Sequence, residues 1–505
     1  MTPTMTRHPS AQRAGRDGFP QVLHAEWTKF RSVRAWVLGM VAAALMMVLV
    51  ALLAGISSDQ RGSPAVPVGP DGGPVTDSFS FVHRPLTGDG SITVSVSALR
   101  SSIATGLANL RPASVPWAKA GLILKGDTRQ GSPYAAIMVT GAHGVRMQHN
   151  YVNDTAGPSG SVSWLRLDRS GDAITGYASA DGTHWTKVST VQVKGLGPTA
   201  QGGLFVASPS SVDGMGTVPS VSTAVFGDLR SQGRWAGGNW TGDQVGPESP
   251  SFPGYPRNTS GSFPGSDGRF TVTGSGDIAP AVRLALATGG TLGEILTGTF
   301  AALITVIVVG TRFITAEYRE GMIHVTLAAS PRRSRVLAAK AIVLGAVTFV
   351  AGLAGSAVAI PLGERLARAN GVYLFPVTFS AQLRIAFGTA ALLAAASILA
   401  LAVGTIFRRG AGAVTSVVAA IVLPYILFAQ VPFLPAGVSN VLARVTPAAA
   451  FAVQQTLVPY RQVTSVYTPY NGYYPMTPWA GFAVLAGYAV VSLAVAAVVL
   501  RRRDA

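Results

Sequence analysis

Acidic and histidine side chains in the middle of the chain are the first candidates for chemistry, and their spacing argues against catalysis. Asp168 and Asp172 flank a predicted hairpin turn, and no glutamate occurs between residues 77 and 230. Glycoside hydrolysis needs two carboxylates set across a cleft. His143 and His149, six residues apart, do not match a metal-ligand spacing. The sequence therefore predicts neither an enzyme nor a metal centre.

Two further kinds of chemistry are excluded by what the sequence lacks. The chain contains no cysteine, so it has no disulfides, no cysteine-ligated zinc and no thiol nucleophile. It also lacks the pattern Gly-x-x-x-x-Gly-Lys-Ser/Thr, whose backbone cradles nucleotide phosphates. We expect no cofactor in this chain, and any ATP-driven activity would need a separate subunit.

The most informative polar segment is residues 312–340 (RFITAEYREGMIHVTLAASPRRSRVLAAK). A helix entering it is predicted to break at Gly321, and Met322–Leu327 forms a short amphipathic stretch. A new helix can begin after Ser330, because Pro331 is tolerated in a first helical turn. A short helix held between two longer ones is a suitable surface for a partner to push.

A second amphipathic segment lies near the N-terminus, at Gln21–Arg34. A helix here places its apolar side chains on one side, namely Val22, Leu23, Trp27, Phe30 and Val33. Charged residues surround the rest, namely Glu26, Lys29, Arg31 and Arg34. This pattern predicts a helix lying in a membrane interface. The alternative is that the segment simply continues the following apolar helix.

The elements that must position these segments are membrane spans. Only 12% of the 505 residues are charged, against about 25% in ordinary soluble domains. Six uncharged apolar runs are long enough to cross ~30 Å of hydrocarbon. The second run has 17 residues, so we expect it to begin earlier, near Leu284. The six runs are Trp36–Ile56, Ile295–Thr311, Ala341–Ile360, Ile385–Phe407, Gly410–Val431 and Trp479–Leu500.

Between the first two runs the pattern changes to short alternating strands. Trp164–Asp168 and Ile174–Ser179 alternate, and Asp181-Gly182 then gives a hairpin signal. Several such strands predict a β-sandwich. The expected organisation is an N-terminal part (1–35), span one (36–56), a linker (57–76), the sandwich (77–230), a Gly/Pro/Ser-rich segment (231–284) and a membrane domain (285–505) with spans at about 285–314, 336–360, 385–407, 410–431 and 479–500.

The net charge of +17 becomes informative once it is placed on this topology. With the N-terminus inside, the inner segments hold 17 Lys/Arg and the short outer loops hold five. The large insert holds 17 basic and 16 acidic residues. This is the positive-inside pattern of a multi-pass plasma-membrane protein with both termini cytoplasmic and an extracellular insert. The excess forms no stripe on a soluble fold, so no nucleic-acid partner is expected.

These segments resemble the ABC-2 type transporter permeases. Glu317-Tyr-Arg-Glu-Gly-Met-Ile, then Leu327-Ala-Ala-Ser-Pro-Arg-Arg before a helix carrying Lys340, is similar to the cytoplasmic loop of that family. The segment AEWTKFRSVR (25–34) resembles the start of actinobacterial members, and Thr446-Pro447 fits their outer helical segment. The resemblance covers residues 20–56 and about 285–505.

The resemblance implies partners and a docking segment. The segment would dock on a separate ATPase that holds ATP-Mg, and a second permease copy or paralogue would complete the pore. For Glu317 and Arg319 the alternative is a solvated surface or a mutual helix pair. The implied docking residues are Glu317, Tyr318, Arg319, Gly321, Met322, Ile323 and Leu327, and the interfacial helix contributes Trp27, Lys29, Phe30, Arg31 and Arg34.

The insert resembles concanavalin-A-like, laminin-G-like jelly rolls of the DUF1349 type. The matching stretches are WAKAGLILK (117–125), WLRLDR (164–169), YASADGTHWT (177–186) and GLFVAS (203–208). The resemblance implies carbohydrate binding, for which Arg146, Arg166 and Trp185 are candidate residues. Strand-like spacing nevertheless favours a core role over a sugar platform for the aromatic residues Trp117, Trp164, Tyr177 and Trp185.

We therefore expect a six-span α-helical membrane protein with an extracytoplasmic all-β jelly roll after the first helix. The expected function is the permease subunit of an exporter, with an outer domain that contacts glycan or cargo. The alternative is a membrane-anchored glycan sensor without transport activity, although no cytoplasmic segment is long enough for a signalling domain. A secondary transporter is disfavoured because the spans lack charged residues.

Overall fold

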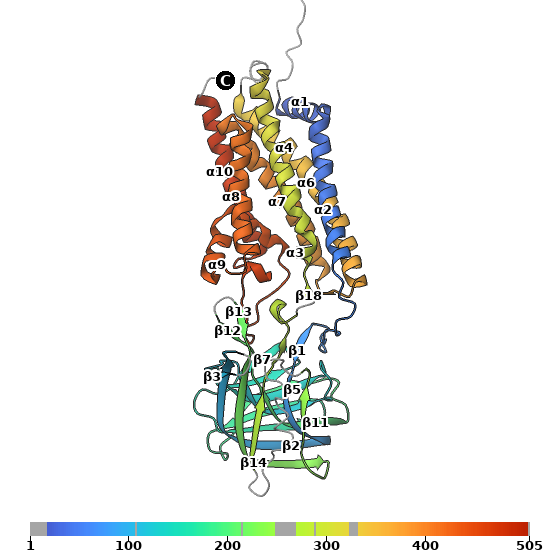
Figure 1. The fold of residues 1–505 in the computed structure, drawn as a ribbon, viewed down its shortest axis with the longest axis vertical. Helices are drawn as coiled ribbons and strands as arrows, with labels where there is room; N and C mark the ends of the chain where they lie inside the picture. The colour runs from blue at the N-terminus through green and yellow to red at the C-terminus, as the bar shows by residue number, and fades with distance from the viewer. Residues whose placement is uncertain are drawn as a thin grey trace, which may run out of the picture.

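The computed structural model describes residues 18–106, 109–213, 216–247, 269–286, 289–322 and 332–502. The molecule is elongated, with a helical bundle at one end and a β-domain at the other (Figure 1). Helix α1 and the last turn of α10 lie at the end of the bundle remote from the β-domain (Figure 1). We call this the α1 end, and the opposite end of the bundle the sandwich end.

Among the described residues, six helical segments are long and apolar enough to span a membrane. Together with the β-domain after the first of them, they confirm the predicted fold class. A bent pair, α9 and η3, turns by 99° before the last span. The helices are α1 (Phe19–Ser32), α2 (Arg34–Ser57), α3 (Leu292–Ile295), η2 (Leu296–Gly298), α4 (Thr299–Arg319), α6 (Arg333–Ala369), α7 (Phe379–Phe407), α8 (Gly410–Gln430), α9 (Ala436–Val445), η3 (Pro447–Gln454), η4 (Pro469–Asn471) and α10 (Pro478–Arg502).

The second span begins at α3, and a capping box fixes its start. The side chain of Thr291 accepts a hydrogen bond from the backbone of Glu294, and the Glu294 carboxylate accepts one from the Thr291 backbone N–H. This reciprocal pairing satisfies two N–H groups that a helix start leaves without partners. The span therefore starts closer to residue 292 than to Leu284, which lies in the separate 3-10 turn η1 (Arg283–Ala285).

Helix α7 lies at the centre of the bundle and is the most buried of the six spans. Small residues let its neighbours approach closely. A side-chain carbon added at Gly310 of α4 would lie 2.7 Å from the Ser397 carbonyl oxygen of α7. Such close packing is a usual basis of helix association in lipid, because the hydrophobic effect does not drive helices together there.

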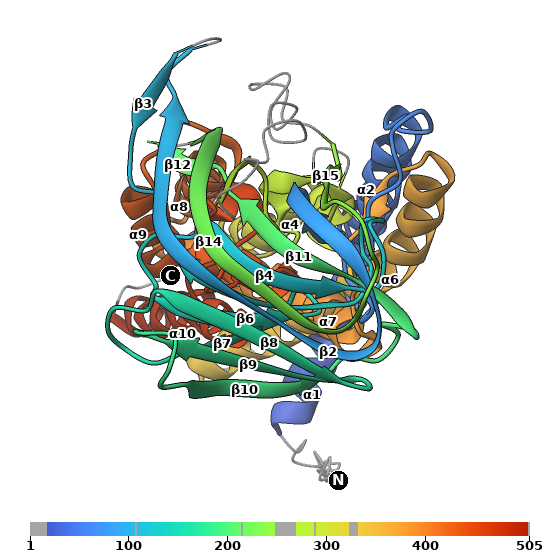
Figure 2. The same ribbon diagram turned by 90° about the horizontal axis from the view of Figure 1, so that it is seen from below.

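Within the described chain, the β-domain is one hydrogen-bonded network of 13 strands built around a very long strand, β2, which belongs to both halves; we call each half a sheet of the sandwich. One sheet has the order β10-β9-β8-β2-β14 and the other β2-β11-β4-β5-β6-β7. The strands lie in front of the membrane helices in Figure 2. The strands are β1 (Val75–Asp77), β2 (Phe79–Ala104), β3 (Leu110–Pro112), β4 (Lys119–Lys125), β5 (Tyr134–Thr140), β6 (Val145–His149), β7 (Asn153–Ala156), β8 (Trp164–Ser170), β9 (Ala173–Ser179), β10 (Thr186–Gln192), β11 (Thr199–Ala207), β12 (Ser211–Asp213), β13 (Gly216–Val218), β14 (Ser220–Trp235), β15 (Thr241–Val245), β16 (Phe270–Gly274), β17 (Ile278–Pro280), β18 (Gly289–Gly290) and β19 (Tyr373–Leu374).

The domain extends past residue 230, where the sequence placed its boundary. Strand β14 continues to Trp235, β15 pairs with β2, β16 pairs with β14, and β17 pairs with β1. The main core lies between the two sheets, and Leu122, Ile137 and Leu167 belong to it. A second core lies on the other face of β4 and β5 and includes Ile278 of β17. Part of the predicted Gly/Pro/Ser-rich segment therefore completes the sandwich.

Two buried ion pairs fix the points where the chain enters and leaves the domain. Lys125 Nζ lies 2.8 Å from Asp77 Oδ2, and neither side chain is exposed. Lys119 Nζ lies 2.5 Å from Asp277 Oδ1 and also donates to the Ile278 carbonyl. The two lysines are the first and last residues of β4. One strand therefore holds both the entering segment and the leaving segment.

The sandwich end of the bundle contacts the β-domain through ordered loops. Gln462, between η3 and α10, donates a hydrogen bond to the Val152 carbonyl oxygen at 3.0 Å. Val463 packs in a small core with Ala279 and Val282 of the returning chain. On the entering side, Arg61 Nη2 donates to Asn370 Oδ1 at 2.6 Å.

Candidate functional site

A buried cluster of charges lies at the α1 end of the bundle. Lys340 Nζ of α6 contacts Glu26 Oε2 of α1 at 2.6 Å and Glu317 Oε1 of α4 at 2.7 Å. Lys29 of α1 contacts the same two carboxylates at 3.0 and 3.2 Å. The Lys340 side chain is 0% exposed, whereas that of Lys29 is 36% exposed. Three segments distant in the sequence are therefore joined by two cations and two anions, which we call the charge cluster.

Aromatic rings close the charge cluster on its apolar side. Lys340 Nζ lies 4.5 Å from the centre of the Phe313 ring, within the range of a cation–π contact. Phe313 also meets Phe30 at 5.6 Å and Trp36 at 5.0 Å between ring centres, both edge to face. The rings anchor α1 and the start of α2 against α4, so α1 is held by buried contacts as well as by its amphipathic surface.

The electrostatics of the charge cluster favour the ionised state of its exposed member. Burial acts to lower the pKa of Lys29, but the Glu26 and Glu317 carboxylates together raise it above its ordinary value. Matched charges in a low-dielectric site stabilise one another only while all partners are present. The charge cluster therefore ties α1, α4 and α6 to one another.

The predicted docking residues divide into a buried part and an exposed part. Glu317 is almost fully buried in the charge cluster, so its carboxylate is not offered to a partner. Tyr318 is half-buried, and the centre of its ring lies 5.2 Å from Arg408 Cζ. Arg319 is exposed beside Glu320. The sequence placed Glu317 on the docking surface because it could not show that Lys340 faces it.

The helix end itself is well defined. Gly321 has φ +70°, the left-handed conformation that glycine adopts without strain and that commonly ends a helix. Met322 follows and is 47% exposed. The remaining predicted docking residues, Ile323 and Leu327, lie outside the described residues.

The interfacial helix occupies α1 but turns differently from the predicted orientation. Phe30 is buried, whereas Trp27, which the sequence placed on the same side, is exposed. Glu26, placed among the charged residues around the rest of the helix, is buried instead. Arg31 and Arg34 are exposed. The helix therefore buries a mixed face of Glu26 and Phe30.

Glu26, Phe313 and Lys340 are members of the site that sequence reasoning did not select. A signal existed for Lys340, which is the one charged residue within the run VLAAKAIVLG (336–345). A lysine inside an apolar helix calls for a buried acidic partner. The partners lie 314 and 23 residues away, which no local pattern reveals.

The three candidate glycan-binding residues do not share one surface. Arg146 of β6 alternates with Val145 and Met147, whose side chains lie in the main core. Arg166 of β8 likewise alternates with core leucines, but in the opposite sheet. The two arginines therefore point away from the sandwich in opposite directions.

Each of these side chains also has its own neighbours. Arg146 forms an ion pair with Asp154 and lies 5.6 Å from the Trp117 ring. Arg166 contacts Asp168 at 2.6 Å. Trp185, the third candidate, is half-buried just before β10.

The aromatic residues of the sandwich only partly follow the core role that their spacing favoured. Trp117 is buried. Trp164 and Tyr177 are half-exposed on the outer face of the sheet that contains β8 and β9. Arg230 lies 5.8 Å from the Trp164 ring, and Arg166 lies 5.8 Å from the Tyr177 ring. This outer face thus carries aromatic and basic side chains side by side, and we call it the aromatic face.

No group of three potential metal ligands occurs within the part of the chain that the structure describes. His143 stacks on Trp117 with ring centres 4.1 Å apart. His149 is half-buried. Neither histidine lies among further ligands. The charge cluster is therefore the candidate functional site.

The fold and the charge cluster define a multi-pass membrane protein with a β-sandwich inserted after its first span. A family model, described as ABC-2 family transporter protein, matches residues 135–505. The chain therefore belongs to the ABC-2 transporter family, and it is a transport membrane subunit. Membership implies, in general terms, a partner ATPase and a dimeric arrangement.

No curated protein matches the chain. Among solved structures, a GH43 protein, BlXynB from Bacillus licheniformis, aligns at 14% identity over 29% of this chain and 28% of that chain, with a TM-score of 0.19. A TM-score this low says nothing about a shared fold or a shared activity.

Proposed function

We propose that this chain is the permease subunit of an exporter that moves its substrate outward. The energy would come from ATP that a separate ATPase subunit binds with Mg²⁺ and hydrolyses. The α1 end would face the cytoplasm together with both termini, and the sandwich would be extracellular. The observation that carries the proposal is the charge cluster. It ties the exposed end of α4 to the helices on either side, beside the surface that a cytoplasmic partner would reach.

The division of the predicted docking residues suggests two separate roles. Arg319 and Met322 are exposed and would contact the ATPase. Glu317, one and a half turns of chain behind Met322, would pass the movement to α6 through Lys340 and to α1 through Lys29. A rigid ionic contact suits this task because its partners cannot separate without leaving buried charges.

The family's dimeric arrangement and the low charge of the spans suggest the kind of assembly and substrate. Two copies of this chain, or one copy and a paralogue, would line the pore between them. The spans carry few charged residues within their apolar windows. An ion would need buried charges along its route, so a lipid-like, amphipathic or polymeric substrate fits better.

The test is binding to, and stimulation of, the ATPase. The chain and its ATPase would be purified together from a host carrying both. We expect Arg319→Ala combined with Met322→Ala to reduce the yield of complex and the stimulated ATP turnover. Arg368→Ala, an exposed arginine at the other end of α6, is the matched control and should change neither. Unchanged binding and turnover in the double variant would show that the end of α4 does not dock.

We also propose that the aromatic face of the sandwich binds carbohydrate. Half-exposed rings at Trp164 and Tyr177 offer surfaces for sugar C–H groups, and Arg166 and Arg230 offer hydrogen-bond donors. The full chain would be screened on a glycan array, with Trp164→Ala as the test and Trp27→Ala, at the α1 end, as the control. Glycan binding that survives Trp164→Ala would rule out this face. A chain that binds glycan but forms no complex with any ATPase would favour the alternative of a membrane-anchored sensor.

A further inference from the structure

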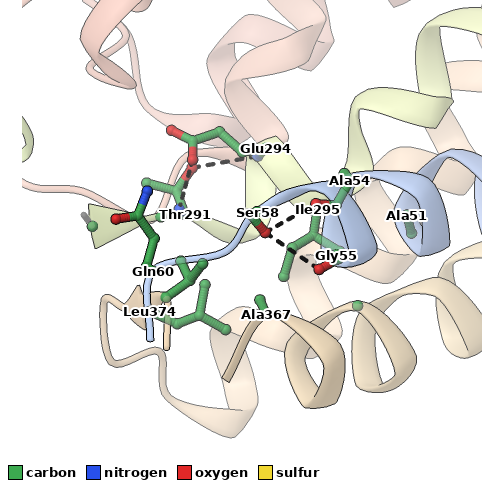
Figure 3. Close-up of a pocket in the computed structure, with 14 residues that line it drawn as sticks. Ala51, Ala54, Gly55, Ser58, Gln60, Thr291, Glu294, Ile295, Ala367 and Leu374 are labelled. Carbon is green, nitrogen blue, oxygen red and sulfur yellow. Dashed lines mark hydrogen bonds between the residues drawn. The ribbon is translucent and has the colours of Figure 1, made fainter. Parts of the chain in front are cut away.

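Two cavities flank the turn Thr291–Glu294 at the sandwich end of the bundle. The first has a volume of about 220 Å³ and lies between the ends of α2, α3 and α6 (Figure 3). The second has a volume of about 100 Å³ and lies between α3, α8, η3 and η4. Both include Thr291 and Glu294 in their walls. A molecule that spanned this turn could occupy both at once.

The first cavity is apolar over most of its wall. Ala51 and Ala54 of α2, Ile295 of α3, Ala367 of α6 and Leu374 of β19 line it (Figure 3). Small residues leave the space open at the point where the bundle ends. Such a wall suits an alkyl group, because it offers burial without requiring hydrogen bonds.

The second cavity is lined by amide, hydroxyl and phenol groups. Its wall contains the amides of Gln430, Gln454 and Gln455 and the phenols of Tyr425, Tyr470 and Tyr474. Gln454 is held in place by α4 and α7, since its Nε2 donates to Thr299 Oγ1 and Thr389 Oγ1 at 3.2 Å each. Amides both donate and accept hydrogen bonds, which matches a ligand that carries several hydroxyl groups.

Two buried oxygen atoms of this wall lack a partner within the described chain. They are Gln455 Oε1 and Thr456 Oγ1. Buried polar atoms in folded proteins are nearly always hydrogen-bonded. Both residues are only half-buried, so a small rotation of either side chain toward a hydroxyl-bearing ligand in the second cavity would supply what these two atoms lack.

The charge of the site points to an uncharged ligand. Glu294 is the only charged residue lining either cavity among the described residues, and its carboxylate lies 3.1 Å from Arg283 Nε. An anion would face this carboxylate, and a cation would compete with Arg283 for it. Both cost free energy, because a charge in such a site needs its own partner.

We propose that the two cavities form one binding site for an amphipathic molecule with an uncharged, polyhydroxylated head group. The head group occupies the cavity around Gln455, and the alkyl part occupies the cavity between α2 and α6. The proposal deepens the proposed export of an amphipathic substrate, since it places such a molecule where it would leave the bundle. It concerns binding only, and it stands or falls without the ATPase.

The test is photolabelling of the full chain in phosphatidylcholine nanodiscs. The probe is octyl glucoside carrying a diazirine, used below its critical micelle concentration. We expect adducts on segments that line the cavities, and competition by unlabelled octyl glucoside but much less by octyl sulfate or octyltrimethylammonium. Adducts spread over the lipid-facing sides of α2 and α10, or equal competition by all three, would overturn the proposal.

Variants separate the site from general partition into lipid. Gln455→Leu should lower cavity labelling about tenfold, the usual effect of leaving a ligand hydroxyl without its partner. Ala54→Phe should do the same by filling the apolar cavity. Gln382→Leu, at the same end of the bundle but outside both cavities, is the matched control. Gln455→Glu keeps the side-chain shape and loses the Nε2 donor to the Leu457 carbonyl oxygen, as Gln455→Leu also does; it should weaken glucoside labelling and increase competition by the ammonium compound. Unchanged labelling in Gln455→Leu and Gln455→Glu would refute the proposal.

Discussion

Replacing Lys340 by methionine tests whether the charge cluster holds the α1 end together. Lys340→Met keeps the length of the side chain but leaves Glu26 and Glu317, which Lys340 contacts at 2.6 and 2.7 Å, with Lys29 as their remaining cation. Breaking a buried ion pair on one side costs about 3–5 kcal/mol. Because Lys29 is partly exposed and contacts both carboxylates, we expect the lower end, about 3 kcal/mol.

The assay is thermal unfolding of the full chain in nanodiscs, followed by tryptophan fluorescence. For a bundle of roughly 200 residues, a loss of about 3 kcal/mol lowers Tm by about 6–12 °C. Arg365→Met, an exposed arginine on the same helix, is the control and should change Tm little. Neutralising the carboxylates as well, with Glu26→Gln and Glu317→Gln, should recover part of the loss. A Lys340→Met chain as stable as the parent would refute the reasoning.

Three further predictions concern the β-domain and the docking helix. Lys125→Met leaves the unexposed Asp77 carboxylate without its cation, so limited proteolysis should cut the sandwich much faster, whereas the exposed Lys187→Met should not. Burial holds the pKa of His149 below its ordinary value of 6.5. The unfolded chain therefore binds a proton at a higher pH than the folded domain does, so the domain should lose stability as the pH falls below about 6.5. His149→Gln should reduce this loss in unfolding curves recorded at pH 5.5 and 7.5, roughly one pH unit on either side of that value. Gly321→Ala places a side chain on a residue with φ +70°, which should cost about 1 kcal/mol at the end of α4. The variant should lower ATPase stimulation in the co-purified complex. Normal stimulation would show that this helix end has no role in coupling.

The membrane part of the fold could be predicted because its signals are local. The uncharged apolar run Gly410–Val431 ends one residue beyond the observed helix α8, whereas α6 extends past the run Ala341–Ile360 at both ends. Alternation predicted β8 and β9 equally well, since each strand has one face in the core. Both patterns depend only on neighbouring residues.

The end of the β-domain was harder to predict because its pairings are distant in the sequence. β17 pairs with β1 across about 200 residues, and β16 returns to β14 after a Gly/Pro-rich stretch. Composition in this region indicates loops, and only tertiary pairing makes strands of it.

The candidate site shows the same division. The sequence identified the end of α4 and the helix α1 as functional segments, but it placed Glu317 on the docking surface and Glu26 on the charged side of α1. Both become buried because Lys340 enters between them from a third helix. A helix pattern gives the angular position of each side chain, but not which neighbour will cover it.

Cysteine crosslinking tests the central claim, docking of a separate ATPase at the end of α4, most directly. The natural chain contains no cysteine, so a single introduced thiol reports one position only. We predict that Met322→Cys, in the complex with the ATPase in nanodiscs, forms a crosslink to that subunit with a short bifunctional reagent, and that Arg368→Cys at the sandwich end does not. No crosslink from position 322 in an assembled complex, or equal crosslinking from both positions, would contradict the account.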